Sequence, residues 1–184
     1  MERSWDTLLV WKPIRVMLIK EKLSDKILTQ SKLIDFISVN KNLGKKIVFT
    51  NGCFDLVHLG HIEYLMRSKE LGDVLIVGVN SDQSVQSIKG PSRPIMPEEH
   101  RYHNLAAYYF IDAVVPFNDE TPLNLIKTIK PDILVKGSDY KPEDVVGYDV
   151  VMNYGGEVIC VDTSLSNSEY STTKIISKIR SLYD

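Results

Sequence analysis

The sequence has few cysteines: Cys53 and Cys160 are the only two in 184 residues. Two are too few for a disulfide framework, and no CxxC spacing suggests a zinc site. We therefore expect a protein of a reducing compartment, the cytoplasm. A free cysteine behaves as a small buried hydrophobe, so Cys160 is predicted to lie in the core. Cys53 would need a paired base and a lowered pKa to act as a nucleophile.

A long uninterrupted hydrophobic run and an excess of basic residues are also missing. The apolar stretch at residues 7–19 is broken by Lys12, Pro13 and Arg15, so it is not expected to span a membrane. Acidic residues precede it and no small-residue cleavage site follows, which argues against a signal peptide. The formal net charge is -2, whereas a general nucleic-acid binder usually has a basic excess. We expect neither a membrane nor a nucleic acid as a partner.

The overall composition is that of an ordinary globular protein. Hydrophobic residues make up 43% of the chain and charged residues 25%, which argues against disorder over most of its length. With 184 residues the chain is about one domain long. We expect residues 1–30 to form an N-terminal extension and residues 31–184 to form a single domain.

Apolar, β-branched runs recur along the chain with helical patterns between them. This alternation is typical of a parallel sheet with helices on both faces. The runs are nearly continuous in their apolar character, as strands buried on both sides are. We therefore predict an α/β fold with an open parallel sheet and a helical N-terminal lead-in. The predicted strands are residues 46–51, 74–80, 113–117, 132–137 and 157–162.

The helices are predicted from their apolar spacing and their end signals. Gly72 marks the end of one helix, and Pro97 lies in the first turn of another. Thr121 is predicted as an N-cap with Pro122 at the first helical position. The predicted helices are residues 31–44, 61–72, 97–110, 121–129 and 168–183.

One connection, residues 87–97, is rich in proline and carries two cations, Lys89 and Arg93, beside Gly90. It follows the second predicted strand, and ligands of such sheets bind outside the carboxyl ends of the strands. We interpret this segment as a candidate substrate flap.

The segment 46–65, KIVFTNGCFDLVHLGHIEYL, passes from a predicted strand into a predicted helix and contains two of the four histidines. The free N–H groups at a helix start form an anion site. His58 and His61 can lie on one side of this turn and donate to one phosphate, and Gly60 lets a ligand approach the backbone. Donors fixed in this way stabilise phosphate charge that grows in a transition state.

The spacing alone is equally compatible with two structural histidines. A metal site is less favoured, because Asp55 is the only further ligand type nearby and catalytic zinc needs three protein ligands.

Two motifs resemble those of the cytidylyltransferase-like nucleotidyltransferases. Residues 50–65, TNGCFDLVHLGHIEYL, match the strand, the G-x-F-D turn and the HxGH sequence at the first helix. Residues 170–175, YSTTKI, match the second motif, usually I-S-T-T-x-I, with Tyr170 at the usual isoleucine. The resemblance implies a Rossmann-like nucleotidyltransferase fold.

Within this family the chain resembles the adenylyltransferase domain of the ADP-heptose pathway enzymes. It carries TNGCFD, LIVGVNSD, KGPSRP and VKGSDY in the order of that branch, and the likeness covers about residues 45–181. Residues 1–30 have no counterpart. The sugar-kinase domain often fused ahead of this one is absent, so we expect a stand-alone form that depends on a separate kinase.

The resemblance implies roles for individual residues. His58, His61 and Lys89 would act in catalysis by binding the triphosphate and neutralising its charge. The nucleotide would be bound by Asn51, Gly52, Cys53, Phe54, Gly60, Ser171, Thr172 and Thr173. The sugar phosphate would be bound by Asp55, Arg93, Lys136, Asp139 and Tyr140.

Simpler structural roles remain open for several residues. Residues 171–173 could be an ordinary helix N-cap, and Asp55 could cap its own turn. Lys89 and Arg93 could be solvated loop cations. For Arg101 we favour a pair with Glu98 on its own helix over a contact with phosphates.

The implied reaction is in-line attack of a sugar 1-phosphate, D-glycero-β-D-manno-heptose 1-phosphate, on the α-phosphorus of ATP. Mg²⁺ is expected as a cofactor that binds with the nucleotide, and pyrophosphate leaves with it. Such a transfer needs positioning and charge neutralisation rather than a covalent intermediate. The resemblance also implies a homodimer.

Two alternatives stay open. Glycerol-3-phosphate or ethanolamine-phosphate cytidylyltransferases share both motifs, but typically have T-Y-G and M-G-x-D-W where this chain has TNG and VKGSDY. The second alternative is a nucleotide-binding regulatory module without catalysis, which the intact motifs disfavour.

Overall fold

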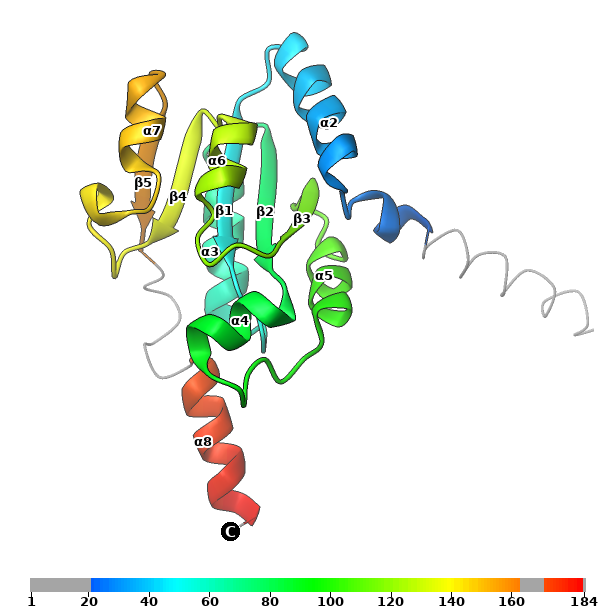
Figure 1. Cartoon of the computed structure of the whole chain (residues 1–184), viewed down its shortest axis with the longest axis vertical. Helices are drawn as coiled ribbons and strands as arrows, with labels where there is room; N and C mark the ends of the chain where they lie inside the picture. The colour runs from blue at the N-terminus through cyan, green and yellow to red at the C-terminus, as the bar shows by residue number, and fades with distance from the viewer. Residues whose placement is uncertain (1–20, 163–170, 184) are drawn as a thin grey trace, which may run out of the picture.

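The structure, a computed structural model, describes residues 21–162 and 171–183 (Figure 1). Its centre is a five-stranded sheet with the strand order β3-β2-β1-β4-β5. All neighbouring strands run parallel. This confirms the predicted open parallel sheet, whose strands are β1 Ile47–Gly52, β2 Val74–Asn80, β3 Ala113–Phe117, β4 Ile133–Gly137 and β5 Glu157–Val161.

Helices cover both faces of the sheet, as Figure 1 shows for α6 in front of β1 and β2 and α3 behind them. None of the described helices has the length and hydropathy that crossing a bilayer requires. The helices are α2 Gln30–Asn42, α3 Leu59–Glu70, α4 Asp82–Lys89, α5 Glu98–Ala106, α6 Leu123–Ile129, α7 Tyr148–Asn153 and α8 Thr172–Tyr183, with a short 3₁₀ turn η1 at Pro142–Asp144.

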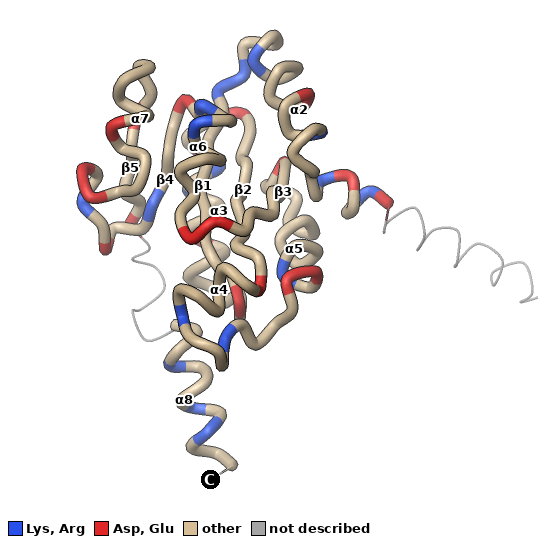
Figure 2. The backbone as a smooth tube through the Cα atoms, viewed as in Figure 1, with Lys and Arg blue, Asp and Glu red and all other residues tan. Residues whose placement is uncertain are grey.

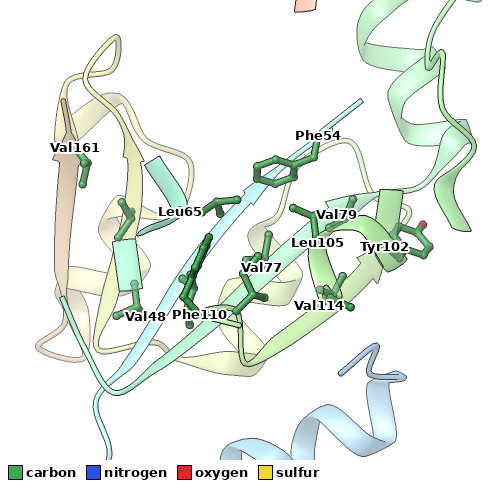
Figure 3. Close-up of a cluster of buried hydrophobic side chains, with 14 of the residues drawn as sticks. Val48, Phe54, Leu65, Val77, Val79, Tyr102, Leu105, Phe110, Val114 and Val161 are labelled. Atoms are coloured by element: carbon green, nitrogen blue, oxygen red, sulfur yellow. The ribbon is translucent and has the colours of Figure 1, made fainter. Parts of the chain in front are cut away.

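The core lies on both sides of the sheet because successive strand residues point to opposite faces. On one face Val48 and Val77 pack in a buried cluster with Leu65 of α3 and Leu105 of α5 (Figure 3). On the other face, Phe49 of β1 belongs to a second buried cluster. The alternation explains why each strand is a continuous apolar run.

The second cluster joins the lead-in helix to the sheet. Leu33 of α2 and Ile126 of α6 are fully buried in it beside Phe49. The chain just before α2 also covers the edge of β3, because the Leu28 N–H donates to the Val114 carbonyl and the Val114 N–H donates to the Lys26 carbonyl. The predicted helical lead-in is thus part of the packed domain.

Two helices, α4 and α7, were not predicted. Each is short, and α4 buries only Ser84 and Val85, so its apolar pattern is weak. Its start is nevertheless capped, because the Ser81 side chain accepts from the Ser84 N–H. The candidate flap therefore begins inside a helix, since α4 continues to Lys89.

Some predicted helix ends were wrong. Pro122 is the N-cap of α6, so Thr121 is not, and Pro97 is likewise the N-cap of α5. Helix α5 ends at Ala106, four residues before its predicted end, and residues 108–110 turn into β3. The start of the predicted last helix, residues 168–170, lies outside the described residues.

The strand order reverses at β1. From β1 the chain goes to β2 and β3 on one side, and later to β4 and β5 on the other. In open α/β sheets ligands bind at this switch point, outside the carboxyl ends of the strands. The site is therefore expected above the ends of β1 and β4.

Candidate active site

The turn after β1 has an unusual backbone. Phe54 has a φ of 48°, a left-handed conformation that non-glycine residues adopt rarely and often at functional sites. Its ring is buried, and it lies so near Gly52 that a Cβ there would be only 3.0 Å from a ring carbon. Glycine at position 52 therefore lets the Phe54 ring close against the end of the strand.

The two histidines of the HxGH motif lie together at the start of α3. Their ring centroids are 4.0 Å apart, and His58 is the N-cap of the helix. The His61 Nδ1 accepts from the His58 backbone N–H at 3.4 Å. This bond assigns the His61 proton to Nε2, because the nitrogen that accepts cannot also carry the proton. The prediction that both rings share one side of the turn is confirmed.

Both histidines are neutral near pH 7. Burial, followed by the charge of His58, lowers the pKa of His61 to about 4. Burial also lowers the pKa of His58. The His58 Nδ1 is buried and has no hydrogen-bond partner among the residues that the structure describes. A buried polar atom without a partner is costly, so a ligand in this place would satisfy it.

Lys136 lies at the end of β4, beside β1. Its Nζ donates to the Asn51 side-chain oxygen at 2.6 Å and to the Asn51 carbonyl at 3.3 Å. Burial lowers the pKa of Lys136 to about 8, although the carboxylate of Asp139 acts in the opposite direction. Asn51 thus holds a half-buried cation at the switch point of the sheet.

The carboxylate of Asp55 binds the candidate flap. It accepts from Arg93 Nε at 2.6 Å and from the N–H groups of Ile95 and Met96 at 2.8 Å. Burial alone would raise the pKa of Asp55, but the Met96 and Ile95 N–H groups, together with Arg93, lower it. The second half of this segment is therefore fastened to the turn after β1.

The second motif is placed beside the first by α8. The Thr172 hydroxyl donates to the Leu56 carbonyl at 3.4 Å, and the Ser171 hydroxyl oxygen accepts from the Lys174 N–H at 3.2 Å. Both the N-cap role and the approach to the HxGH turn are therefore present. Figure 2 shows that α8 carries Lys and Arg but no acidic residue, so it adds positive charge near this end of the sheet.

All of the predicted site residues line one cavity of about 940 Å³ at the carboxyl end of the sheet. This shared position was expected from the strand ends, whereas the individual roles stay predictions. The predicted residues in the lining are Asn51, Gly52, Cys53, Phe54, Asp55, His58, Gly60, His61, Lys89, Arg93, Lys136, Asp139, Tyr140, Ser171, Thr172 and Thr173. The others are Tyr64, Asn80, Ile88, Glu120, Gly137, Ser138 and Asp162.

Tyr64 is a lining residue that sequence reasoning missed. Its hydroxyl donates to the Val135 carbonyl at 2.9 Å and lies 2.6 Å from the Thr50 hydroxyl, which joins α3 to β1 and β4. Burial raises its pKa. The available signal was its position three residues after His61, which places both side chains on one helix face.

The prediction for Arg101 was wrong. Its guanidinium pairs with Asp82 at 2.9 Å instead of Glu98, and it also donates to two backbone carbonyls. Glu98 accepts from the Asp82 N–H at 2.7 Å. The side chain of Arg101 is only 1% exposed, so it faces the interior between the turn and α5.

The described residues contain no group of three or more His, Cys, Asp or Glu side chains that could hold a metal ion. The cavity does contain carboxylates, including Asp139, Asp162 and Glu120. Mg²⁺ is commonly bound by one or two carboxylates together with substrate phosphates, rather than by an all-protein cage. The donor set therefore fits Mg²⁺ that arrives with a nucleotide.

Comparisons with known proteins agree with this geometry. A family model described as cytidylyltransferase-like matches residues 49–178. The chain is 51% identical over 159 residues to the bifunctional protein HldE of Syntrophotalea carbinolica, covering 86% of this chain and 32% of that protein. It is 55% identical over 151 residues to the bifunctional protein HldE of Geobacter metallireducens, covering 82% and 30%. The chain spans about a third of the length of these curated relatives.

A solved structure is also similar: a lipopolysaccharide core biosynthesis protein from Thermoplasma volcanium GSS1. The TM-score is 0.53 at 30% sequence identity, covering 65% of this chain and 96% of that chain. The family model covers well over half of the chain and includes both motifs that line the cavity. The chain therefore belongs to the cytidylyltransferase-like family.

Proposed function

We propose that this chain is an adenylyltransferase that joins AMP from ATP to D-glycero-β-D-manno-heptose 1-phosphate and releases pyrophosphate. One observation carries the proposal: the HxGH turn, the S-T-T helix start, and the KGPSRP and VKGSDY segments all contribute to a single cavity. The sugar and the base come from the resemblance of these segments to the heptose branch. The similarity to HldE proteins and to a lipopolysaccharide core biosynthesis protein supports that branch.

The two histidines act as neutral hydrogen-bond donors to the triphosphate. With its Nδ1 accepting from the backbone, His61 presents the Nε2–H to the ligand. The buried, unpartnered Nδ1 of His58 would gain a partner in the complex. Donors that are already in place stabilise the charge of a pentacoordinate α-phosphorus without reorganisation during the reaction.

The cations of the cavity neutralise the two phosphates that are joined. Lys136 lies at the switch point, while Lys89 is at the exposed end of α4 and Arg93 is on the fastened part of the following loop. An oxygen of the sugar phosphate attacks the α-phosphorus in line with the leaving pyrophosphate. Because the substrate supplies the nucleophile, no protein nucleophile is needed. Burial raises the pKa of Cys53, which agrees with a non-nucleophilic role.

When bound, Mg²⁺ supplies charge neutralisation for the triphosphate and the leaving pyrophosphate. Asp139 and Asp162, which follow the ends of β4 and β5 and line the cavity, are the residues that would hold it. The rest of its ligands would be phosphate oxygens and water.

The test is a matrix of pyrophosphate release that combines ATP, CTP and GTP with both anomers of heptose 1-phosphate and with glycerol 3-phosphate. We expect the highest kcat/KM for ATP with the β-anomer. A preference for CTP and glycerol 3-phosphate would identify the cytidylyltransferase alternative. An absence of turnover with every pair would reject the enzyme and favour a regulatory module.

We further propose, from the same resemblance, that the protein is a homodimer of the cytoplasm. The mass in solution can be measured by light scattering coupled to size-exclusion chromatography. A monomer at micromolar concentration would reject the dimer.

A further inference from the structure

A buried cluster of charged residues joins the turn after β1 to the loop that carries Arg93. Arg101 of α5 lies at its centre and donates to the Cys53 carbonyl at 2.6 Å and the Met96 carbonyl at 3.0 Å. Asp55 makes the same connection from the other side, by accepting from the Ile95 and Met96 N–H groups. Two separate sets of hydrogen bonds, one from Arg101 and one to Asp55, therefore connect the turn to the loop.

Arg101 also reaches the start of α4, where it pairs with Asp82 at 2.9 Å. A guanidinium offers donors in a fixed, planar fork, so three acceptors can be held at once in one geometry. Lysine has a flexible stem and a single ammonium group, so it cannot replace this arrangement. The side chain is 1% exposed and is not part of the cavity lining, so it does not contact a ligand directly.

The bond to Cys53 determines the direction of a peptide group in the site. The peptide between Cys53 and Phe54 is trans, so the Phe54 N–H points opposite to the Cys53 carbonyl. Arg101 draws that carbonyl toward the interior, on the side away from the cavity that Cys53 and Phe54 line. The left-handed backbone of Phe54 belongs to the same turn and is sparsely populated unless surrounding contacts hold it.

We propose that Arg101 is a positioning residue that aims the Phe54 N–H into the cavity as a nucleotide ligand and keeps the Arg93 loop against the nucleotide-binding turn. This inference rests on the proposed function for the identity of the ligand. It assigns to a buried arginine outside the cavity a role in nucleotide affinity. It also makes the second half of the candidate flap, from Arg93 to Met96, a fixed wall of the site.

The test compares the variants Arg101→Met and Arg101→Lys with a matched control, Lys69→Met. Lys69 is also a charged side chain that joins separate segments, because it pairs with Asp112 at 2.7 Å, but it does not line the cavity. Thermal unfolding of each variant reports the stability lost. Calorimetry with α,β-methylene-ATP and Mg²⁺ reports nucleotide affinity without any turnover.

We expect Arg101→Met to weaken binding of the analogue and to lower kcat/KM for ATP by about a hundredfold, the scale of a misplaced site group. Arg101→Lys should fall between Arg101→Met and the wild type. Lys69→Met should lose stability but keep the wild-type affinity. If Arg101→Met does not fold, the analogue affinity of Arg101→Lys is compared with that of Lys69→Met. An affinity of Arg101→Lys as high as that of Lys69→Met would then overturn the role of Arg101.

Hydrogen exchange of the ligand-free proteins separates this inference from the proposed function. The Ile95 and Met96 amides are protected by Asp55, so we expect faster exchange in residues 93–97 of Arg101→Met and no change there in Lys69→Met. This result needs neither nucleotide nor turnover, so it holds even if no substrate pair reacts. Wild-type affinity in a folded Arg101→Met variant, or unchanged exchange in residues 93–97, would overturn the role of Arg101.

Discussion

Two segments supply the proposed phosphate ligands, and they are attached to the domain in different ways. The connection from β1 to α3 is anchored from within: Phe54 and Asp55 are buried, and Arg101 and the 93–96 loop bind it from the side. Among the residues that the structure describes, α8 has no buried side chain, and the Thr172 hydroxyl donates to the Leu56 carbonyl of the turn at 3.4 Å. The first segment is therefore built into the core, whereas the described part of the second lies on the surface.

This difference predicts that substitutions in the two segments change different kinetic constants. Donors on the anchored turn should act mainly on the rate of the chemical step, because their positions are fixed relative to the α-phosphorus. Donors on α8 should act mainly on nucleotide binding, because they lie on a surface helix and are less rigidly fixed relative to the α-phosphorus than donors built into the core. The following variants test this prediction from the largest expected effect to the smallest.

The histidine variants should have the largest effect. His61→Ala or His58→Ala should lower kcat by about a hundredfold or more, the scale of losing one oxyanion donor. KM for ATP should change much less. Stopped-flow measurement of pyrophosphate release would check this, with His103→Ala on α5, outside the cavity, as the matched control. A near-normal kcat for His61→Ala would contradict the assignment.

The Lys136 variant should have the second-largest effect. Lys136→Met removes a charged donor, which should lower kcat/KM by roughly thirtyfold, the scale of a charge-assisted hydrogen bond. The exposed Lys127→Met on α6 is the matched control. If the sugar-phosphate KM and kcat both stay at wild-type values, Lys136 does not contact the substrate.

The same residue predicts a pH dependence. The pKa of Lys136 is lowered to about 8, so its ammonium is charged below that pH and becomes neutral above it. The profile of kcat/KM, which reports the free enzyme, should therefore fall as the pH rises through about 8. This fall in kcat/KM near pH 8 should be missing from the profile of Lys136→Met. If the same fall persists in the variant, it is caused by the titration of a group other than Lys136.

The α8 variant should have a smaller effect. Thr172→Ala should raise KM for ATP by roughly fivefold, the scale of a neutral hydrogen bond, and leave kcat nearly unchanged. Ser177→Ala, exposed farther along the same helix, is the control. A loss confined to kcat would show that α8 is as fixed as the histidine turn, and the comparison would fail.

A core variant should leave the site intact. Leu33 is fully buried between α2 and the sheet, so Leu33→Ala should lower the free energy of unfolding by about 2–5 kcal/mol. Urea unfolding measures this loss. At a temperature where the variant is folded, kcat/KM should equal that of the wild type. A large loss of kcat/KM would mean that the packing of α2 against the sheet affects the geometry of the cavity.

The sheet could be predicted from the sequence because its signal is local. Residues such as Val48 and Phe49 pack on opposite faces, so each strand is a continuous apolar run that is visible without any partner. Helices α4 and α7 escaped prediction because each is short and buries few apolar side chains.

The residues of the site that belong to the sequence motifs could be predicted, whereas those outside the motifs could not. The motifs assigned Asn51 to the nucleotide and Lys136 to the sugar phosphate, and both line the cavity, but the hydrogen bond between their side chains was not predicted. Arg101 could not be placed, since its neighbour on the helix, Glu98, suggested a local pair. Its true partners include Cys53, 48 positions away in the chain, so only the folded arrangement identifies them.

The most direct test of the central claim, attack on the α-phosphorus in this cavity, is ³¹P NMR of the reaction mixture with ATP, Mg²⁺ and heptose 1-phosphate. The account predicts that the sugar monophosphate signal is replaced by two coupled diphosphate signals of an ADP-sugar and that pyrophosphate appears in equal amount. ADP together with a sugar bisphosphate would show transfer of the γ-phosphoryl group instead and would contradict the account.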